Sequence, residues 1–100
     1  MRPADFVIAV ETMTGGGRYT ARTSGVNAEA ELTWREAGAG KRIAAHTGVP
    51  DDFRGQGVGR MLVKRMVDDA RAQGFKIVPR CSYVEAERRK HPEWADVFTT

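Results

Sequence analysis

At Val58 the hydrophobic pattern of the sequence changes from the two-residue period of strands to the period of a helix. The positions that follow are apolar at intervals of three and four residues, and most positions between them are charged, which is typical of an amphipathic helix. Gly74 comes after the last apolar position, and glycine commonly ends a helix in the left-handed conformation. The pattern predicts one helix that begins at Val58 and ends before Gly74. Its apolar positions are Val58, Met61, Leu62, Met66, Val67 and Ala70.

Short segments rich in β-branched and aromatic residues precede and follow this helix. The predicted strands are residues 6–10, 18–23, 29–35, 42–49 and 75–79. A second helix is predicted over residues 84–91, and Pro92 either interrupts it or begins a new short helix. A strand–helix–strand unit pairs its two strands in parallel. We therefore expect an α/β (α+β) fold: a mixed sheet in which antiparallel N-terminal strands are followed by strand–loop–helix–strand–helix.

Two local patterns give further expectations. In the strand 42–49, simple alternation places Ile43, Ala45, Thr47 and Val49 on one face, and Ala44, His46 and Gly48 on the other. The run Gly15-Gly16-Gly17 reads either as a hairpin loop or as a functional glycine loop. Because no helix pattern follows these glycines, we expect the hairpin loop.

Length and composition narrow the class of protein. The chain has 100 residues, of which 41% are hydrophobic and 29% charged, and we expect one globular domain over residues 1–100. It has no apolar run near the ~20 residues that span a bilayer. Residues 1–5 also lack the apolar stretch of a secretory signal, so we expect a cytoplasmic protein with no membrane partner. One cysteine and two histidines give no paired ligand spacing, so no metal site is expected.

The net charge of +3 favours an anionic ligand. One basic cluster, Arg88-Arg89-Lys90, fits either a solvated helix face or a phosphate contact. Aromatic residues do not interleave with it as a surface for single-stranded nucleic acid requires, so nucleic acid is a disfavoured partner. An exposed edge among the N-terminal strands could pair two copies, and we expect a monomer or a weak homodimer.

The segment Arg54-Gly55-Gln56-Gly57-Val58-Gly59 joins the strand 42–49 to the long helix. Its three glycines allow the backbone to turn tightly and to approach a ligand closely. The first turn of a helix has unpaired N–H groups and a dipole that favours negative charge, so the segment reads as a phosphate-binding loop. It is neither a Walker loop, which needs Lys after its last glycine, nor a dinucleotide fingerprint, whose glycine spacing differs. A tight strand-to-helix turn without a ligand is the alternative.

Within this segment, Arg54-x-x-Gly57-x-Gly59 resembles the Gln/Arg-x-x-Gly-x-Gly/Ala motif of the GNAT superfamily of N-acetyltransferases. Residues 46–50, 79–84 and 91–94 further resemble the pattern of the minimal GNAT-like subgroup, and the resemblance extends over residues 43–94. It implies a GNAT-like sheet and an acetyl-coenzyme A-dependent N-acetyltransferase. The acceptor implied is a primary amine of a small molecule or an exposed lysine, and the transfer is expected to be direct. A non-catalytic coenzyme A-binding module is the alternative.

The resemblance also implies which residues contact acetyl-coenzyme A, the co-substrate. Backbone groups of the strand would bind the pantetheine arm, and the glycine loop would bind the pyrophosphate. His91 either caps the helix, which is the favoured interpretation, or contacts the co-substrate. The acceptor side would be open, because the helices that larger family members have there are missing. The implied contacts are Thr47, Val49, Arg54, Gly55, Gln56, Gly57, Val58, Gly59, Arg60 and His91.

Three residues are candidates for the chemistry. The resemblance places Cys81 near the sulfur of the co-substrate, where it could be the acid for the leaving thiolate or a nucleophile; packing is its alternative role. His46 could accept a proton near neutral pH, or it could be a hydrogen-bonded structural residue. Tyr83 could donate a proton, although packing in the core is the favoured interpretation.

Two departures from the subgroup pattern bear on catalysis. The subgroup usually has Glu where this chain has Gly48, beside the co-substrate arm, so a candidate base could be missing. It usually has an aromatic and an aliphatic residue where this chain has Glu87 and Arg88, which changes the packing or polarity of the last helix. Both departures leave co-substrate binding intact and concern the transfer step.

Overall fold

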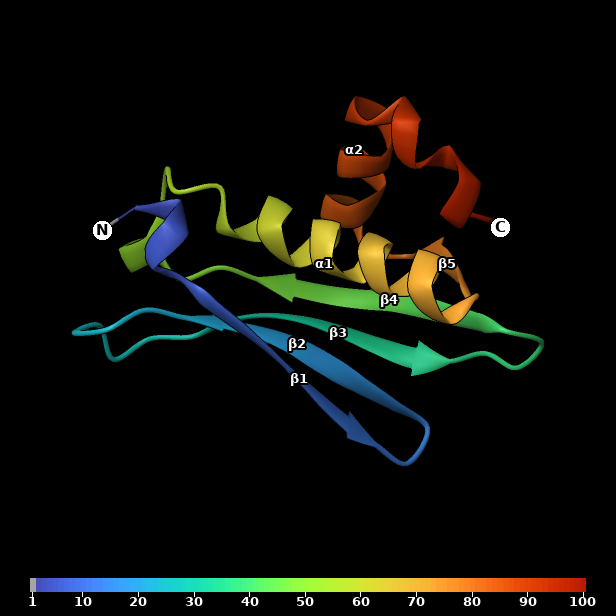
Figure 1. Ribbon diagram of the computed structural model, residues 1–100, viewed down its shortest axis with the longest axis horizontal. Helices are drawn as coiled ribbons and strands as arrows, with labels where there is room; N and C mark the ends of the chain where they lie inside the picture. Colours follow the sequence, from blue (N-terminus) through green and yellow to red (C-terminus); the bar gives the residue numbers. More distant parts are fainter. Residues whose placement is uncertain (1) are drawn as a thin grey trace.

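The computed structural model describes residues 2–100 and contains a mixed five-stranded sheet with the strand order β1-β2-β3-β4-β5 (Figure 1). Strands β1 to β4 pair antiparallel in sequence order, and β5 joins β4 in parallel after the crossover helix α1. This architecture confirms the expected mixed α/β fold. The elements are η1 (Pro3–Asp5), β1 (Val7–Met13), β2 (Gly16–Arg22), β3 (Ala30–Glu36), β4 (Lys41–Gly48), η2 (Asp51–Phe53), α1 (Val58–Gln73), β5 (Lys76–Pro79), α2 (Ser82–Lys90) and η3 (Pro92–Val97).

Both α-helices lie on one face of the sheet, and no helix of residues 2–100 lies on the opposite face (Figure 1). The apolar stripe of α1 packs on β2 and β3, where Leu62 of the helix and Tyr19 and Leu32 of the sheet are all fully buried. The Tyr19 hydroxyl also donates a hydrogen bond of 2.9 Å to Asp69 of α1. Burial of the phenol and its bond to this carboxylate raise the pKa of Tyr19, which therefore stays neutral at physiological pH.

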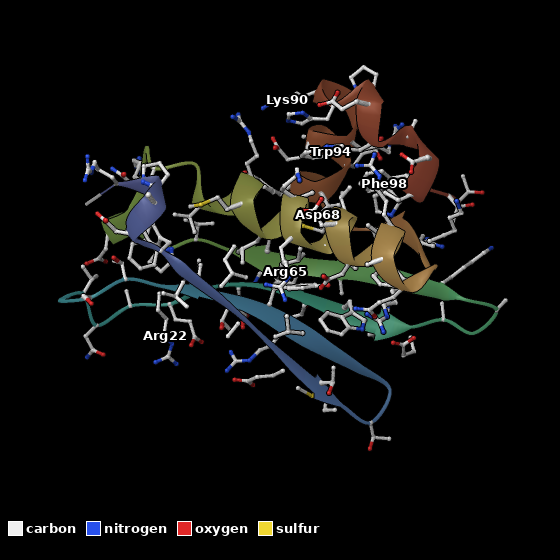
Figure 2. The ribbon with its side chains drawn as sticks, in the orientation of Figure 1. Arg22, Arg65, Asp68, Lys90, Trp94 and Phe98 are labelled. Atoms are coloured by element: carbon white, nitrogen blue, oxygen red, sulfur yellow. The ribbon has the colours of Figure 1, made fainter. Side chains whose placement is uncertain are left out.

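The helix ends follow the sequence signals closely. Gly74 caps α1 with a left-handed φ of 83° and donates its N–H to the Ala70 carbonyl at 2.8 Å. Pro92 begins the short helix η3 and does not extend α2. Figure 2 shows Lys90, Trp94 and Phe98 along this C-terminal layer, which ends beside β5 through a bridge between Ile77 and Phe98. In the part of the chain from residue 2 onward, no helix combines the length and apolarity needed to cross a bilayer.

The three consecutive glycines have different roles. Gly15 lies in the β1–β2 turn with a φ of 81°, as expected for a hairpin. Gly16 and Gly17 are buried strand residues of β2, so the expectation that all three form a loop is wrong. A Cβ atom at Gly17 would lie 2.5 Å from the ring of Trp34, which shows that the indole fills the space a side chain would need.

A β-bulge interrupts the pairing of β4 with β3. Thr33 pairs with His46, but the next residue of β3, Trp34, pairs with Ala44, so Ala45 is an extra residue in β4. The expected strict alternation along β4 is therefore wrong. Ala44 and Thr47 pair with core-facing residues on the helix side, whereas Ile43, His46 and Gly48 share the other face.

The face of the sheet away from the helices is polar. Arg18 is its centre, with salt bridges to Glu11 at 3.0 Å, Glu29 at 3.0 Å and Glu31 at 3.2 Å. Figure 2 shows Arg22 on this side of the sheet, where it also pairs with Glu29. Because these charged groups are partly solvated, they stabilise the fold only weakly, but they fix the positions of the carboxylates.

Candidate functional site

The glycine loop after η2 forms the start of α1. Phe53 is almost fully buried and packs edge-on against Phe6, with ring centroids 4.8 Å apart, which anchors the loop to the core. Gly55 and Gly57 have φ values of 81° and 70°, a region that glycine adopts without strain. Gly57 is the N-cap of α1, and no side chain of residues 2–100 caps the helix. The first N–H groups of α1 therefore remain available to an anion.

A hollow of about 270 Å³ opens at this loop. Tyr83 of α2 closes one side of it by packing on Gly59, where a Cβ atom would lie 2.5 Å from the phenolic oxygen. Gly59 is thus needed for the close approach of the two helices. The pKa of Tyr83 is raised by burial and by the nearby Glu87 carboxylate, so the phenol keeps its proton at neutral pH. The lining residues are Val49, Pro50, Asp51, Phe53, Arg54, Gly55, Gly57, Val58, Gly59 and Tyr83.

Basic side chains flank the hollow. Arg54 is largely exposed and is bonded to Asp51 at 2.7 Å. Arg60, in the first turn of α1, places its Nε 3.4 Å from the Oε1 of Glu87. Both guanidinium groups are solvent-accessible and lie beside the loop, where they add positive charge to that of the helix N-terminus.

Beyond the loop, β4 and β5 separate. Their parallel pairing ends at Ala44 and Pro79, whereas β4 continues to Gly48. The Ala44 carbonyl is the last acceptor that β4 offers to the β5 side. It accepts hydrogen bonds from the N–H groups of Arg80 at 3.2 Å and Cys81 at 3.0 Å. The edge of β4 over residues 45–48, here called the free edge of β4, is therefore unpaired with β5 and can hydrogen-bond an extended ligand.

Cys81 lies at the closed end of this separation, as the N-cap of α2. Its Sγ donates a hydrogen bond to the Thr47 hydroxyl at 3.4 Å. Burial alone would raise the pKa of the thiol, but the Thr47 hydroxyl and the backbone N–H groups of Val84, Tyr83 and Thr47 together lower it below its ordinary value. A thiol of this kind is a better proton donor and a more readily formed thiolate than a free cysteine.

Known proteins share both the sequence pattern and the architecture. The family model described as GCN5-related N-acetyl-transferase matches residues 18–97 of the chain. This chain belongs to the GCN5-related N-acetyltransferase family. It is 31% identical over 77 residues to Protein NATD1 of Gallus gallus, a match that covers 75% of this chain and 68% of that protein. Protein NATD1 of Homo sapiens is also 31% identical over 77 residues, with 66% of its length covered.

A solved structure agrees with this assignment. The NMR structure of a GCN5-like candidate N-acetyltransferase from Staphylococcus aureus has a TM-score of 0.70 and 31% sequence identity to this chain. The match covers 91% of this chain and 87% of the Staphylococcus aureus chain. The family model thus shows the family of this chain, and the solved structure shows its fold.

Most of the expected site residues fall into three groups in this GCN5-related chain, while Arg60 flanks the hollow and His91 lies apart from it. The first group lines the hollow and comprises Val49, most of the glycine loop and Tyr83, while Gln56 lies in the loop without lining it. Thr47 and Cys81 form the second group, at the separation of β4 and β5. His46 stands apart on the uncovered face of the sheet, largely exposed and with its Nε2 4.0 Å from the Oε2 of Glu31.

His91 lies at the far end of α2. Its ring stacks on Trp94, with centroids 3.9 Å apart, and its Nδ1 is 3.0 Å from the Glu93 carboxylate. Its Nε2 lies 3.6 Å from Glu87, the same carboxylate that faces Arg60. His91 is therefore linked to the loop through Glu87 and does not line the hollow.

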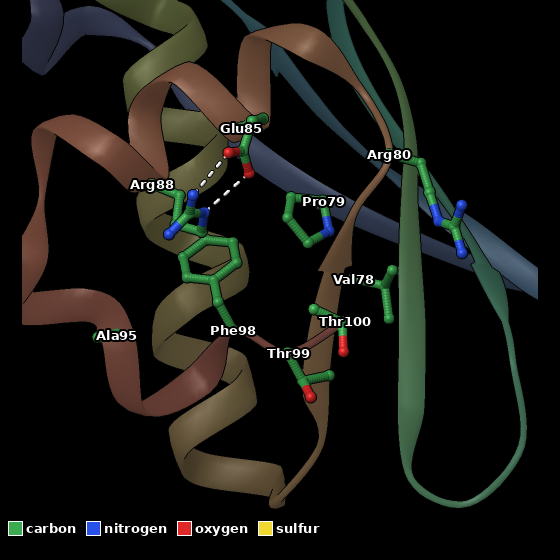
Figure 3. A pocket seen from close by; sticks show the side chains of 9 residues that line it. All are labelled: Val78, Pro79, Arg80, Glu85, Arg88, Ala95, Phe98, Thr99 and Thr100. Atoms are coloured by element: carbon green, nitrogen blue, oxygen red, sulfur yellow. Dashed lines mark hydrogen bonds and ion pairs between the residues drawn. The ribbon is translucent and has the colours of Figure 1, made fainter.

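The two departures in α2 have different surroundings. Glu87 is buried, with 2% of its side chain exposed, and it faces Arg60, Lys90 and His91. Arg88 points the other way and forms a bidentate pair with Glu85, which lowers the pKa of Glu85 to about 2. Figure 3 shows this pair at a second, larger hollow between β5, α2 and the C-terminus.

Two contacts of the site were not predicted from the sequence. The resemblance implied only the backbone of Thr47, yet its hydroxyl bonds Cys81. Glu31 was not a candidate, although the alternation of charged residues in the strand 29–35 placed it on a half-exposed strand. Both contacts join segments that are distant in the sequence, and no composition signal marks them.

Proposed function

We propose that this protein is an acetyl-coenzyme A-dependent N-acetyltransferase that acts directly on a primary amine. The observation that carries the proposal is the uncapped N-terminus of α1 at a glycine loop, directly beside the free edge of β4. The loop and helix N-terminus suit a pyrophosphate, and the edge suits the amide groups of a pantetheine arm. The acceptor is a small molecule or an exposed lysine.

The residues that bind the co-substrate come from both features. The N–H groups of Gly55, Gly57, Val58, Gly59 and Arg60 face the pyrophosphate, and the Arg54 and Arg60 guanidinium groups add charge. The Gln56 N–H donates to the Phe53 carbonyl at 3.2 Å, so Gln56 contributes by holding the turn of the loop. The backbone of Thr47 and Val49 bonds the pantetheine arm. His91 contributes through its contact with Glu87, which also faces Arg60.

Acetyl transfer to an amine requires a polarised carbonyl, a proton acceptor for the amine and a proton for the leaving thiolate. A backbone N–H on the free edge of β4 polarises the carbonyl. Cys81 donates the proton to the leaving thiolate, because its lowered pKa favours that donation. The neutral phenol of Tyr83 is a second donor at the same site. His46 accepts the proton of the amine from the uncovered face.

An amine panel tests the transfer step. Purified protein is mixed with acetyl-coenzyme A and a range of primary amines, including lysine peptides, while free thiol release and the mass of the acetylated amine are followed. The proposal expects an acetylated product above the uncatalysed rate for at least one amine, and a reduced rate for Cys81→Ser. If the co-substrate binds but no amine is acetylated, the transferase proposal fails.

The second candidate function is a non-catalytic coenzyme A-binding module. Gly48 favours it, since the position beside the free edge of β4 offers no side-chain base. This candidate predicts equal affinity for coenzyme A and acetyl-coenzyme A and no acetylated product. Product formation by the wild-type protein would rule it out.

A further inference from the structure

Gly48 provides the space in which the His46 ring lies. Both residues are on the uncovered face of β4, and a Cβ atom at position 48 would lie 3.3 Å from His46 Nε2. A side chain at position 48 would therefore be in close contact with the imidazole and would require it to shift slightly. The expected carboxylate is absent at position 48, and the imidazole of His46 lies beside this position.

Glu31 provides a carboxylate at the same point of the face. It is the direct cross-strand partner of Gly48, and side chains of such a pair point to the same side of the sheet. Its Oε2 lies 4.0 Å from His46 Nε2. Its Oε1 accepts a hydrogen bond of 3.2 Å from Arg18. One oxygen is thus held by a guanidinium, and the other faces the imidazole.

This pair lies where β4 bulges and parts from β5. The bulge at Ala45 puts His46 on the uncovered face and the next residue, Thr47, beside Cys81 on the helix side. A reacting group bound along the free edge of β4 would have Cys81 on one side and His46 on the other. Because no helix of residues 2–100 covers the His46 side, an acceptor can reach the free edge of β4 from there.

We propose that Glu31 is a positioning residue for His46 and that the two form the proton-accepting pair of the transfer, an inference that rests on the proposed function. With the Nε2 hydrogen directed at Glu31, His46 Nδ1 accepts the proton that the amine loses as its nitrogen bonds to the acetyl carbon. The carbon–sulfur bond breaks, its electron pair leaves with the sulfur, and the thiolate takes the proton of Cys81. Glu31 stabilises the imidazolium that forms.

The other charged groups around His46 leave this role intact. The neighbouring charges are Arg18 on β2, Glu31 on β3 and Glu29 just before β3, and Arg18 pairs with both carboxylates. On the β5 side the basic group is Arg80, whose side chain is exposed. His46 is itself largely exposed, so the amine of an acceptor can reach its ring.

The test compares Glu31→Gln, His46→Gln and the double variant with wild type, using the amine identified by the panel. His46→Gln should lower kcat/KM about 100-fold, because it removes the group that accepts the amine proton. Glu31→Gln should lower kcat about fivefold, the size expected for a partly exposed pair, while the calorimetric Kd for acetyl-coenzyme A stays at the wild-type value. Because Glu31 acts only through the ring, the double variant should be no slower than His46→Gln.

Glu11→Gln is the matched control, since Glu11 also bonds Arg18 but belongs to β1 and has no contact with His46. It should keep the wild-type kcat. A wild-type kcat in Glu31→Gln, or losses that multiply in the double variant, would overturn the inference while leaving the proposed function intact. Absence of turnover by the wild-type protein would overturn the proposed function together with this inference. The wild-type activity therefore distinguishes failure of the inference alone from failure of the proposed function.

Discussion

Cys81 acquires its chemical character from residues that are distant in the sequence. Its thiol meets the Thr47 hydroxyl because β4 and β5 part at Ala44, and it meets two backbone N–H groups because α2 begins at the next residue. These donors stabilise the thiolate against the cost of burial and lower the pKa of the thiol. The same cysteine placed within a helix would lack them.

Thr47→Val tests this cause. The change removes the hydroxyl but keeps the shape of the side chain, so the pKa of Cys81 should rise and the thiolate should form at higher pH. The rate of alkylation by iodoacetamide, measured from pH 6 to 10, should therefore shift toward alkaline pH. Thr23→Val is the control, because the Thr23 hydroxyl bonds the Asp5 carbonyl far from the thiol. An unchanged alkylation profile in Thr47→Val would contradict the stated cause.

At the scale of elements, α1 combines two roles. Its apolar stripe packs on the sheet and forms the core with it. Its N-terminus presents free N–H groups at the glycine loop. The position of those groups depends on the packing of the stripe, because a helix that shifts on the sheet also moves its first turn. The stability of this helix on the sheet therefore underlies the geometry of the candidate site.

Leu62→Ala tests the packing role. Leu62 is fully buried between α1 and the sheet, and its truncation should lower the free energy of unfolding by about 2–5 kcal/mol. Lys64→Ala in the same helix removes a side chain that is half exposed, and should change the free energy by no more than about 0.5 kcal/mol. Urea unfolding followed by circular dichroism measures both values. Equal midpoints for the two variants would show that the stripe is not the core.

Local patterns in the sequence predicted most helices and strands, but not the irregular pairing of β4 or the contacts between distant segments. The change of period at Val58, the cap at Gly74 and the glycine loop are local signals, and the structure places all three as expected. The bulge at Ala45 has no such local signal and is visible only in the pairing of β4 with β3. The contacts of Thr47 with Cys81 and of Glu31 with His46 join segments that are distant in the sequence, so no local signal predicted them.

At the scale of the whole molecule, the sheet separates two surfaces. The side on which both α-helices lie (Figure 1) carries the glycine loop and Cys81. The opposite side carries His46 and an Arg18-centred network of carboxylates. The free edge of β4 is the place where both surfaces are accessible. Under the proposed function the co-substrate occupies the helix side and the acceptor approaches from the other, so neither blocks the other.

Calorimetric titration of acetyl-coenzyme A into three proteins tests the central claim that the glycine loop binds the pyrophosphate. Gly57→Glu places a bulky anion at the N-cap of α1, whereas Gly25→Glu makes the same change in the turn between β2 and β3. Both glycines have positive φ, of 70° and 80°, and both have open space where a Cβ would lie, so the two variants carry comparable backbone strain. Wild type and Gly25→Glu should bind, and Gly57→Glu, still folded, should lose at least about tenfold in affinity. Equal affinity in all three, or no binding by the folded wild type, would contradict the claim.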